Sequence, residues 1–314
     1  MNISYIEPLQ RGWDRMEKAL FHPFDIHKWF VLGFTAFLAG LTDFHGGSGD
    51  SGNYYDRHKV DWDEFIDFPY MAWEWLLENI FWFGLIIFGV FVLIILSIVF
   101  TWLSSRGKFM FLDNVIHNRA KVRDPWNDYS REGDSLFVWR LVFGIICSIL
   151  IIGFLIFAFV MIRNMVFDDM ATPGKVLMII GLILQFLVLI IIISYISLFL
   201  NNFVVPIMYK YRLTATQGWG RFMKVLSMHP GHFILYGLFI FVLGILVFIC
   251  IVLFGLFTCC IGWLLLIIPY IGSVVFLPVS YTFRAFSVEY LEQFGEDLKF
   301  FPEEPTEEDG LRTV

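Results

Sequence analysis

The chain has 314 residues, of which 58% are hydrophobic and 16% are charged, and its formal net charge is −7. A soluble domain is usually about 45–50% apolar, with about a quarter of its residues charged. The composition therefore excludes an ordinary soluble domain, and the acidic net charge gives no reason to expect a nucleic-acid partner.

The N-terminal segment predicts an amphipathic helix rather than a secretory signal. Its acidic residues are mixed with basic ones, and it contains neither an apolar h-region nor a small-residue cleavage site. The stretch LQRGWDRMEKAL places four apolar residues on one helical face: Leu9, Trp13, Met16 and Leu20. Because Trp prefers the depth of the lipid headgroups, we expect this helix to lie in the membrane interface.

Six apolar runs follow. Five of them are long enough to cross the hydrocarbon core of a bilayer, which takes about 20 helical residues; these runs are Ile80–Trp102, Leu136–Ile162, Val176–Leu200, Phe233–Thr258 and Ile261–Phe283. The earlier run Trp29–Phe44 is shorter, so we expect a short or tilted first span. Pro269 and Pro278 should kink or break the last run. The sequence thus predicts an all-α integral membrane protein with about six transmembrane helices.

Two later segments resemble the one at Leu9, namely VRDPWNDY at Val122 and TQGWGRFMKVL at Thr216. Each has Gly or Pro, then Trp, and each precedes two apolar runs; the middle copy soon reaches SREGD, so its helix should be short or absent. We therefore predict a single membrane domain, residues 1–314, made of three repeats of an amphipathic interfacial helix plus a transmembrane hairpin. The repeats cover approximately residues 9–105, 122–212 and 215–284, and residues 285–314 form an acidic cytoplasmic tail.

The distribution of Lys and Arg predicts the orientation. Eighteen of the 22 basic residues fall in the four segments that six spans would place on one side, and the other side holds Arg57, Lys59, Arg163 and Lys175. By the positive-inside rule, both termini should be cytoplasmic. We expect a multi-pass protein of the inner, or cytoplasmic, membrane.

The apolar runs contain little that points to chemistry. Their central portions have no ionisable side chain, and the strongest polar group is Gln185, on one helical stripe with Ser194, Ser197 and Asn201. Intramembrane ionisable groups mark most pumps and ion-coupled transporters, so we interpret Gln185 as an interhelical hydrogen-bonding group rather than part of a substrate path. The HPGH stretch at His229, with His22 and His27, lacks a familiar metal-ligand spacing. We expect no cofactor, no metal and no enzymatic activity.

Two stretches carry a family resemblance: KWFVLGFTAFLAG, and NNFVVPIMYKYRLTATQGWGRF before a later span. They resemble bacterial polytopic membrane proteins of unknown function related to the membrane domain of some glycerophosphodiester phosphodiesterases. The pattern is also similar to a superfamily of helical membrane proteins that assemble into rings or bowls and trap lipid. The resemblance implies an architecture and a lipid ligand. It brings no catalytic residues, because the two stretches resemble the membrane domain and not the phosphodiesterase catalytic domain.

The leading interpretation is a non-enzymatic membrane protein that forms a homo-oligomeric ring, with a pentamer as the first guess, and binds, encloses or organises phospholipid. The expected interfacial lipid anchors are Trp13, Trp126 and Trp219. The expected headgroup contacts are Arg11, Arg15, Arg221 and Lys224. The alternative is a membrane component of a transport or secretion system, which would require a soluble partner or an ATPase.

Overall fold

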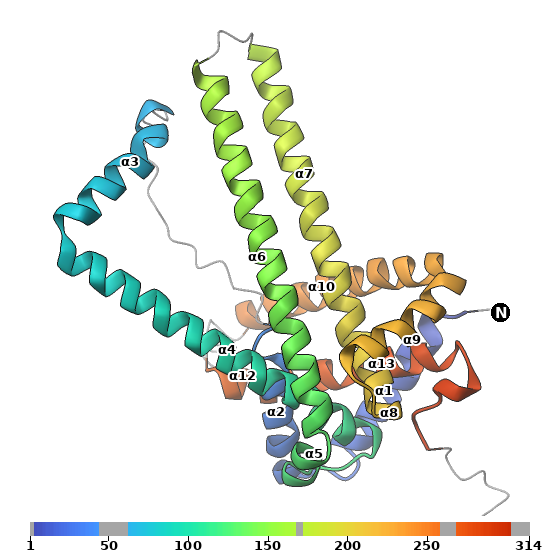
Figure 1. Cartoon of the computed structure of the whole chain (residues 1–314). Coiled ribbons are helices and arrows are strands. Elements are labelled where there is room, and N and C mark those ends of the chain that lie inside the picture. Colours follow the sequence, from blue (N-terminus) through green and yellow to red (C-terminus); the bar gives the residue numbers. More distant parts are fainter. Residues whose placement is uncertain (1–2, 44–61, 168–171, 258–267, 303–314) are drawn as a thin grey trace, which may run out of the picture. The chain divides into compact units, whose positions relative to one another are not determined.

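The structure, a computed structural model, describes residues 3–43, 62–167, 172–257 and 268–302 (Figure 1). Within these ranges every regular element is a helix, which confirms the all-α class. The helices are α1 (Ile6–Leu20), α2 (Ile26–Gly40), α3 (Trp62–Glu78), α4 (Ile80–Ile116), α5 (Arg123–Asp128), α6 (Ser130–Phe167), α7 (Thr172–Phe199), the π-helical turn η1 (Leu200–Val204), α8 (Val205–Tyr211), α9 (Ala215–Met228), α10 (Pro230–Phe257), α12 (Pro269–Val275), α13 (Leu277–Glu292) and the 3-10 turn η2 (Glu296–Leu298).

The chain divides into two compact units. Unit 1 comprises residues 1–41, 102–139 and 195–314, and unit 2 comprises residues 42–101 and 140–194. Helices α4, α6 and α7 each contribute residues to both units, because each is far longer than an ordinary globular helix.

Four helical stretches are long and apolar enough to cross a membrane: Ile80–Ile116, Ser130–Met165, Pro173–Tyr211 and Pro230–Phe257. The described residues thus contain four such helices, where the sequence predicts about six. Helix α2 has 15 residues, so it is about 22 Å long, whereas the hydrocarbon core is about 30 Å thick. In the last apolar run, residues 258–267 lie outside the described residues, and α12 and α13 begin at or beside the two prolines expected to break it.

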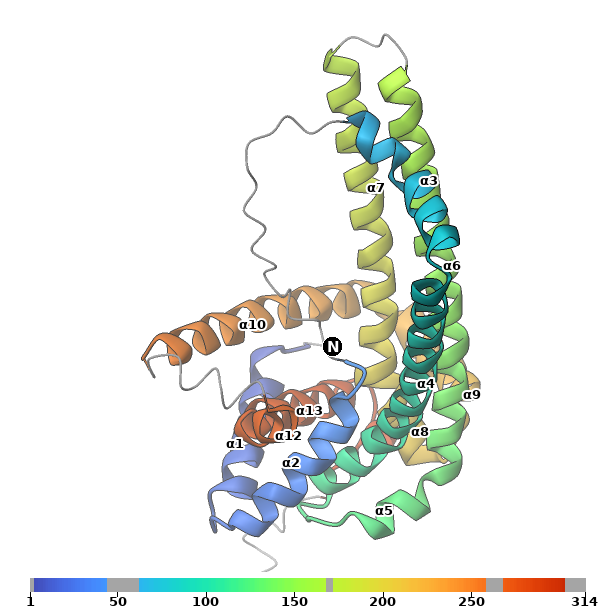
Figure 2. The same ribbon diagram turned by 90° about the vertical axis from the view of Figure 1, so that its left-hand side faces the viewer.

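The two short apolar helices pack against each other in unit 1. A Cβ atom at Gly33 of α2 would lie 2.5 Å from Cγ2 of Val274 in α12, so the absence of a side chain at Gly33 allows the close approach. The Tyr270 hydroxyl, also in α12, donates a hydrogen bond to the carbonyl oxygen of Phe30 at 3.0 Å. Figure 2 shows α2 beside α12. These two helices thus find a partner in each other.

The core of unit 1 is aromatic. The Phe203 ring in η1 lies 5.4 Å from the Phe222 ring, 5.0 Å from the Phe233 ring and 4.8 Å from the Tyr236 ring, measured between centroids. All four side chains are fully buried or nearly so. Large aromatic rings dominate core energetics, and their edge-to-face pairs add to the burial of apolar area. This cluster joins η1, α9 and α10 into one packed body.

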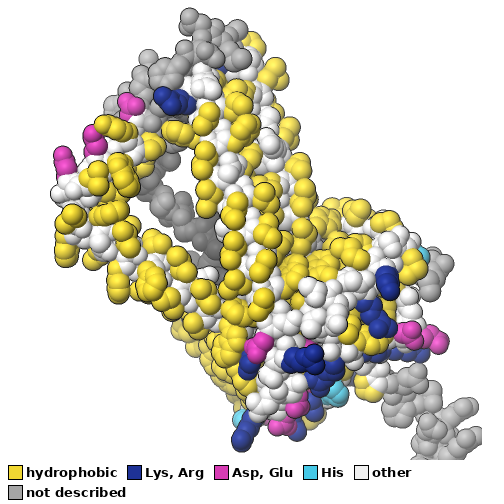
Figure 3. Space-filling view, viewed as in Figure 1, with side chains coloured by type: hydrophobic (Ala, Val, Ile, Leu, Met, Phe, Trp, Pro, Cys, Tyr) yellow, Lys and Arg dark blue, Asp and Glu magenta, His cyan; other side chains and the backbone are white. Residues whose placement is uncertain are grey.

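Unit 2 has no comparable core among its described residues. Helices α6 and α7 are joined by stacked rings of Phe154 and Phe186, with centroids 5.3 Å apart, and their remaining apolar side chains are largely exposed. The guanidinium of Arg140 donates hydrogen bonds to Thr42 and to Asp43 within the same unit. Figure 3 shows hydrophobic side chains covering the long helices, while charged side chains gather over α5 and α9. The hydrophobic surface of the long helices is stable only in apolar surroundings.

Candidate functional site

In each of the three Trp-led segments, the residue immediately before Trp is buried. A Cβ atom at Gly12 of α1 would lie 2.9 Å from the backbone nitrogen of Phe286 in α13. A Cβ atom at Gly218 of α9 would lie 2.7 Å from Cγ of Met208 in α8. In the middle segment, α5, the buried residue is Pro125. The Gly/Pro-Trp pattern is therefore a packing device that seats α1 on α13 and α9 on α8.

The three tryptophans expected as lipid anchors have different surroundings. Trp13 is 55% exposed, although its helical neighbours Met16 and Leu20 are buried in α1. Trp126 is half-buried and makes an edge contact with Trp102, with centroids 5.7 Å apart. Trp219 is half-buried, stacks on Trp139 at 5.5 Å, and its buried Nε1 has no hydrogen-bond partner in the described chain. Among the three, Trp13 has the surface best suited to contact lipid.

The four residues expected to contact headgroups also differ in whether their charged groups are accessible. Arg15 donates from Nε to the nearly buried carboxylate of Glu289 at 2.6 Å, and its guanidinium lies 3.8 Å from the Phe301 ring centroid. Arg221 lies 3.5 Å above the Tyr211 ring. Both cations are thus engaged within unit 1. Arg11 pairs with Glu7 and also lies 3.7 Å from the Glu289 carboxylate, but 59% of its side chain is exposed. Lys224 is exposed as well, so these two cations remain accessible to a headgroup.

Sequence reasoning missed a polar centre in unit 1, which consists of Lys108, Asn201 and Arg284. The Lys108 ammonium donates to the side-chain oxygen of Asn201 at 2.7 Å, and Arg284 donates to the backbone carbonyl of Asn201 at 2.7 Å. Lys108 is only 1% exposed. Each residue follows the second apolar run of one of the three predicted repeats, near the end of α4, in η1 and in α13. A π-helical turn often marks a functional or strained position, because its hydrogen bonding departs from that of the α-helix.

Lys108 was missed because it looks like one more basic residue on the cytoplasmic flank of a span. The signal in the sequence was its position between apolar residues, in SSRGKFMF, where a helix places it on the same face as Ser104 and Ser105. Both serines are fully buried. In the sequence, Asn201 belongs to a polar stripe with Gln185, whereas in the structure its side-chain oxygen accepts from Lys108 and its backbone oxygen accepts from Arg284.

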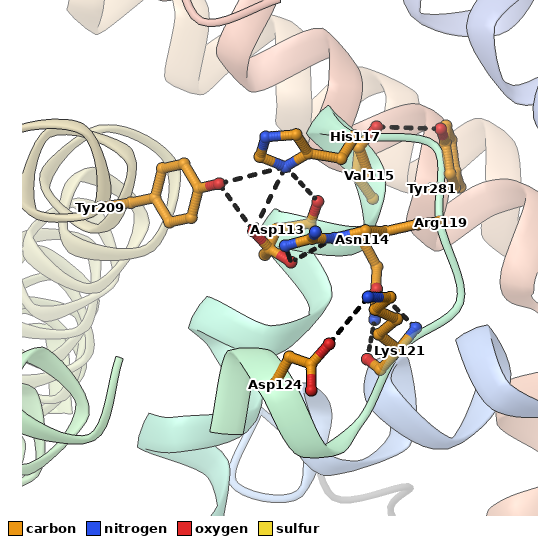
Figure 4. A network of polar contacts seen from close by, with 9 residues as sticks. All are labelled: Asp113, Asn114, Val115, His117, Arg119, Lys121, Asp124, Tyr209 and Tyr281. Carbon is orange, nitrogen blue, oxygen red and sulfur yellow. Dashed lines mark hydrogen bonds and ion pairs between the residues drawn. The ribbon is translucent and has the colours of Figure 1, made fainter. Parts of the chain in front are cut away.

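A second polar network surrounds the buried carboxylate of Asp113 (Figure 4). The Tyr209 hydroxyl donates to Asp113 at 2.9 Å, and Arg119 donates to it from two nitrogens, at 3.0 and 2.6 Å. The hydrogen bond to Asp113 raises the pKa of the Arg119 guanidinium. His117 lies beside the same carboxylate, with Nδ1 3.3 Å from its oxygen. A buried charge needs such partners, so this network fixes the turn between α4 and α5.

The turn between α4 and α5 is also held by its backbone conformation and by contacts from a side chain to its backbone. Asn118 has a positive φ of 49°, a conformation that Asn tolerates better than most residues. The Asn114 side chain accepts from the backbone nitrogen of Lys121 at 2.9 Å and donates to the carbonyl of the same residue at 2.8 Å. The Asp113 network therefore has the character of a structural clamp on the connection to α5.

The histidines do not converge on a metal centre in the part of the chain that the structure describes. No group of three or more His, Cys, Asp or Glu side chains there is placed to hold a metal ion. The rings of His229 and His232 are 6.1 Å apart, and Nδ1 of His232 lies 3.1 Å from the Tyr5 hydroxyl.

Comparison with known proteins gives one result. No curated protein and no solved structure matches the chain significantly. A family model described as a family of unknown function, DUF7544, matches residues 3–300. The match covers almost the whole chain, including α1, the four long apolar helices and α13. The chain therefore belongs to the DUF7544 family, a family of unknown function.

Proposed function

We propose that this protein is a non-enzymatic inner-membrane protein that forms a closed homo-oligomer, a ring in the simplest arrangement, and binds or encloses phospholipid. One observation carries the proposal: in the most apolar 18-residue windows of α4, α6 and α7, no residue is buried. Such helices need acyl chains or further protein around them. The resemblance of the sequence to ring-forming, lipid-trapping membrane proteins supports the same function.

The surface of unit 1 offers contacts for lipid headgroups. Trp13 is exposed on the amphipathic helix α1, and Arg11 and Lys224 are accessible cations. A well-placed Lys or Arg contributes about 1 kcal/mol of attraction to an anionic membrane surface. This arrangement favours anionic phospholipid over zwitterionic phospholipid.

The orientation that we propose puts both termini in the cytoplasm. It is supported by the composition of unit 1, in which α1, the end of α4, α9 and α13 contribute buried residues to one core. These elements come from the four segments that hold most of the Lys and Arg residues. Elements that share one core lie on one side of the membrane, and the positive-inside rule makes that side cytoplasmic.

Native mass spectrometry of the detergent-purified protein tests the proposal, since it reports subunit number and retained lipid together. We expect an oligomer with bound phospholipid. Trp13→Ala and the Arg11→Gln/Lys224→Gln double variant should retain the fold and the oligomer. The first should retain less lipid, and the second should shift the retained lipid away from anionic species.

Trp219→Ala is the structural comparison, because Trp219 stacks on Trp139 inside unit 1. Its main effect should be a lower thermal stability of the protein, rather than a change in the amount or kind of retained lipid. A protein that is monomeric in both mild detergent and native-membrane nanodiscs, and that retains no phospholipid in mild detergent, would refute the proposal. A stable complex with a soluble partner, with lipid content unchanged in every variant, would instead favour a component of a transport or secretion system.

A further inference from the structure

Gln185 is a polar side chain at the middle of an apolar helix. It lies 13 residues after the start of α7 and 14 before its end, so about 20 Å of helix separates it from either end. Its side chain is exposed, and no described group forms a hydrogen bond with its amide. Within a bilayer, water is absent at this depth, and a buried or lipid-facing amide gains from any hydrogen-bonding partner.

The amide lies in a groove between α6 and α7 of about 480 Å³. Gly153 and Phe154 line the α6 side, and Val188 and Ile192 line the α7 side with Gln185. Gln185 is the one hydrogen-bonding side chain among the residues that line it in the described chain. The nearby Ser148 hydroxyl donates to the carbonyl of Gly144 at 2.8 Å, so it already has an acceptor.

We propose that a second copy of this chain occupies the groove, with the α7 helices packed around a two-fold axis and the two Gln185 side chains hydrogen-bonded to each other. A glutamine amide has both donors and an acceptor, so two of them can pair reciprocally. A symmetric contact brings the same surface to itself, and this surface has no other polar side chain to offer. An acyl chain would fill the apolar walls, but it has no group that can satisfy the amide.

This inference rests on the proposed homo-oligomer and specifies one of its contacts. A two-fold contact requires an even number of subunits, either a dimer or a ring with dihedral symmetry. It therefore replaces the pentamer expected from the sequence.

Cysteine cross-linking in native membranes tests the contact in a background that lacks the four native cysteines. Val188 lines the groove one turn from Gln185 and is 54% exposed. Leu187 is at the same depth and 50% exposed, but it does not line the groove. Under copper-phenanthroline oxidation, Val188→Cys should form a covalent dimer and nothing larger, whereas Leu187→Cys should stay monomeric on a denaturing gel.

The contribution of the Gln185 amide is measured by energy transfer and by the same cross-linking assay. Gln185→Leu should weaken association, measured by energy transfer between labelled copies in vesicles, by roughly tenfold in the dissociation constant. It should also reduce the Val188→Cys cross-link, while Gln185→Asn should preserve much of both. Equal cross-linking at both positions, or a Val188→Cys cross-link unaffected by Gln185→Leu, would overturn the inference.

The two proposals fail differently. A cross-link through Leu187→Cys alone would show an oligomer that uses another face, which refutes the Gln185 contact and leaves the proposed function intact. A protein that shows neither cross-link nor energy transfer in membranes would refute both the contact and the homo-oligomer.

Discussion

A Cβ atom at Gly12 would lie 2.9 Å from the backbone nitrogen of Phe286 and 3.2 Å from the carbonyl oxygen of Thr282. Since both neighbours are backbone atoms, they cannot rotate away. Glycine at this position is what lets α1, near the N-terminus, pack directly on α13, near the C-terminus.

We predict that Gly12→Ala will destabilise the protein by about 1–3 kcal/mol, because the added methyl group must push the two helices apart. The control is Gly220→Ala in α9, where a Cβ atom would meet nothing within 4 Å. That change should be neutral or stabilising by up to about 1 kcal/mol, since alanine favours the helix. Thermal unfolding in detergent, followed by tryptophan fluorescence, measures both. Equal melting temperatures for the two variants would contradict the proposed role of Gly12.

The polar centre predicts opposite effects for two substitutions at Asn201. Asn201→Leu removes the oxygen that accepts from Lys108, leaving a buried ammonium with one hydrogen bond fewer. The expected loss is about 1–3 kcal/mol of unfolding free energy. Asn201→Asp keeps an acceptor of the same shape and adds a negative charge beside two cations, so it should be tolerated or stabilising. Equal destabilisation by both variants would show that the Lys108 contact contributes little.

The Asp113 network predicts which of two substitutions, Tyr209→Phe or Arg119→Met, destabilises the protein more. Tyr209→Phe removes one neutral donor and should cost about 1 kcal/mol, whereas Arg119→Met removes a cation and two hydrogen bonds from a buried carboxylate and should cost more. Adding Asp113→Asn to Arg119→Met should recover part of the loss, because the unpaired charge is then gone. Chemical denaturation of the three variants measures the ranking, and a larger loss from Tyr209→Phe than from Arg119→Met would contradict it.

The carboxyl of Glu292 should make the stability of the folded protein depend on pH. Burial raises the pKa of this carboxyl above its ordinary value of 4.5, against hydrogen bonds from the backbone nitrogens of Phe301 and Phe300 that lower it. The folded chain thus holds the proton more tightly than the unfolded chain. The resulting stabilisation is fully present below pH 4.5 and is lost as the pH rises through the folded-state pKa.

Glu292→Gln keeps a carbonyl acceptor and cannot ionise. Its melting temperature relative to wild type should therefore increase as the pH rises from about 4 to 7. Glu296→Gln, at an exposed carboxyl in η2, serves as the control and should show a flat difference across the same range. A flat difference for Glu292→Gln as well would contradict the assignment.

The proposed topology, with both termini in the cytoplasm, predicts which surface residues a membrane-impermeant maleimide can reach in intact cells. In a cysteine-free background, Lys175→Cys at the start of α7 should be labelled from outside. Arg123→Cys, an exposed position in α5, should be labelled only after the membrane is opened. The reverse pattern would place unit 1 outside the cell.

The sequence alone determined the class of this protein and most of its long helices. Runs of twenty or more apolar residues can satisfy their backbone hydrogen bonds in a bilayer only as helices, so α4, α6, α7 and α10 followed from composition. The amphipathic helices α1 and α9 followed from the period of their apolar residues, and the six-residue length of α5 agrees with the interruption after Tyr129.

Only the tertiary structure decided which of these residues face one another. Periodicity gives the face of a helix but not its partner, so the Trp-led segments read as free interfacial helices although α1 is seated on α13 through Gly12. The Trp29–Phe44 run predicted a short or tilted span, but not that Gly33 allows α2 to pack against α12. The polar centre was invisible for the same reason. Lys108, Asn201 and Arg284 are far apart in the sequence, and only packing of the three segments brings two cations to one asparagine, where burial makes each hydrogen bond matter.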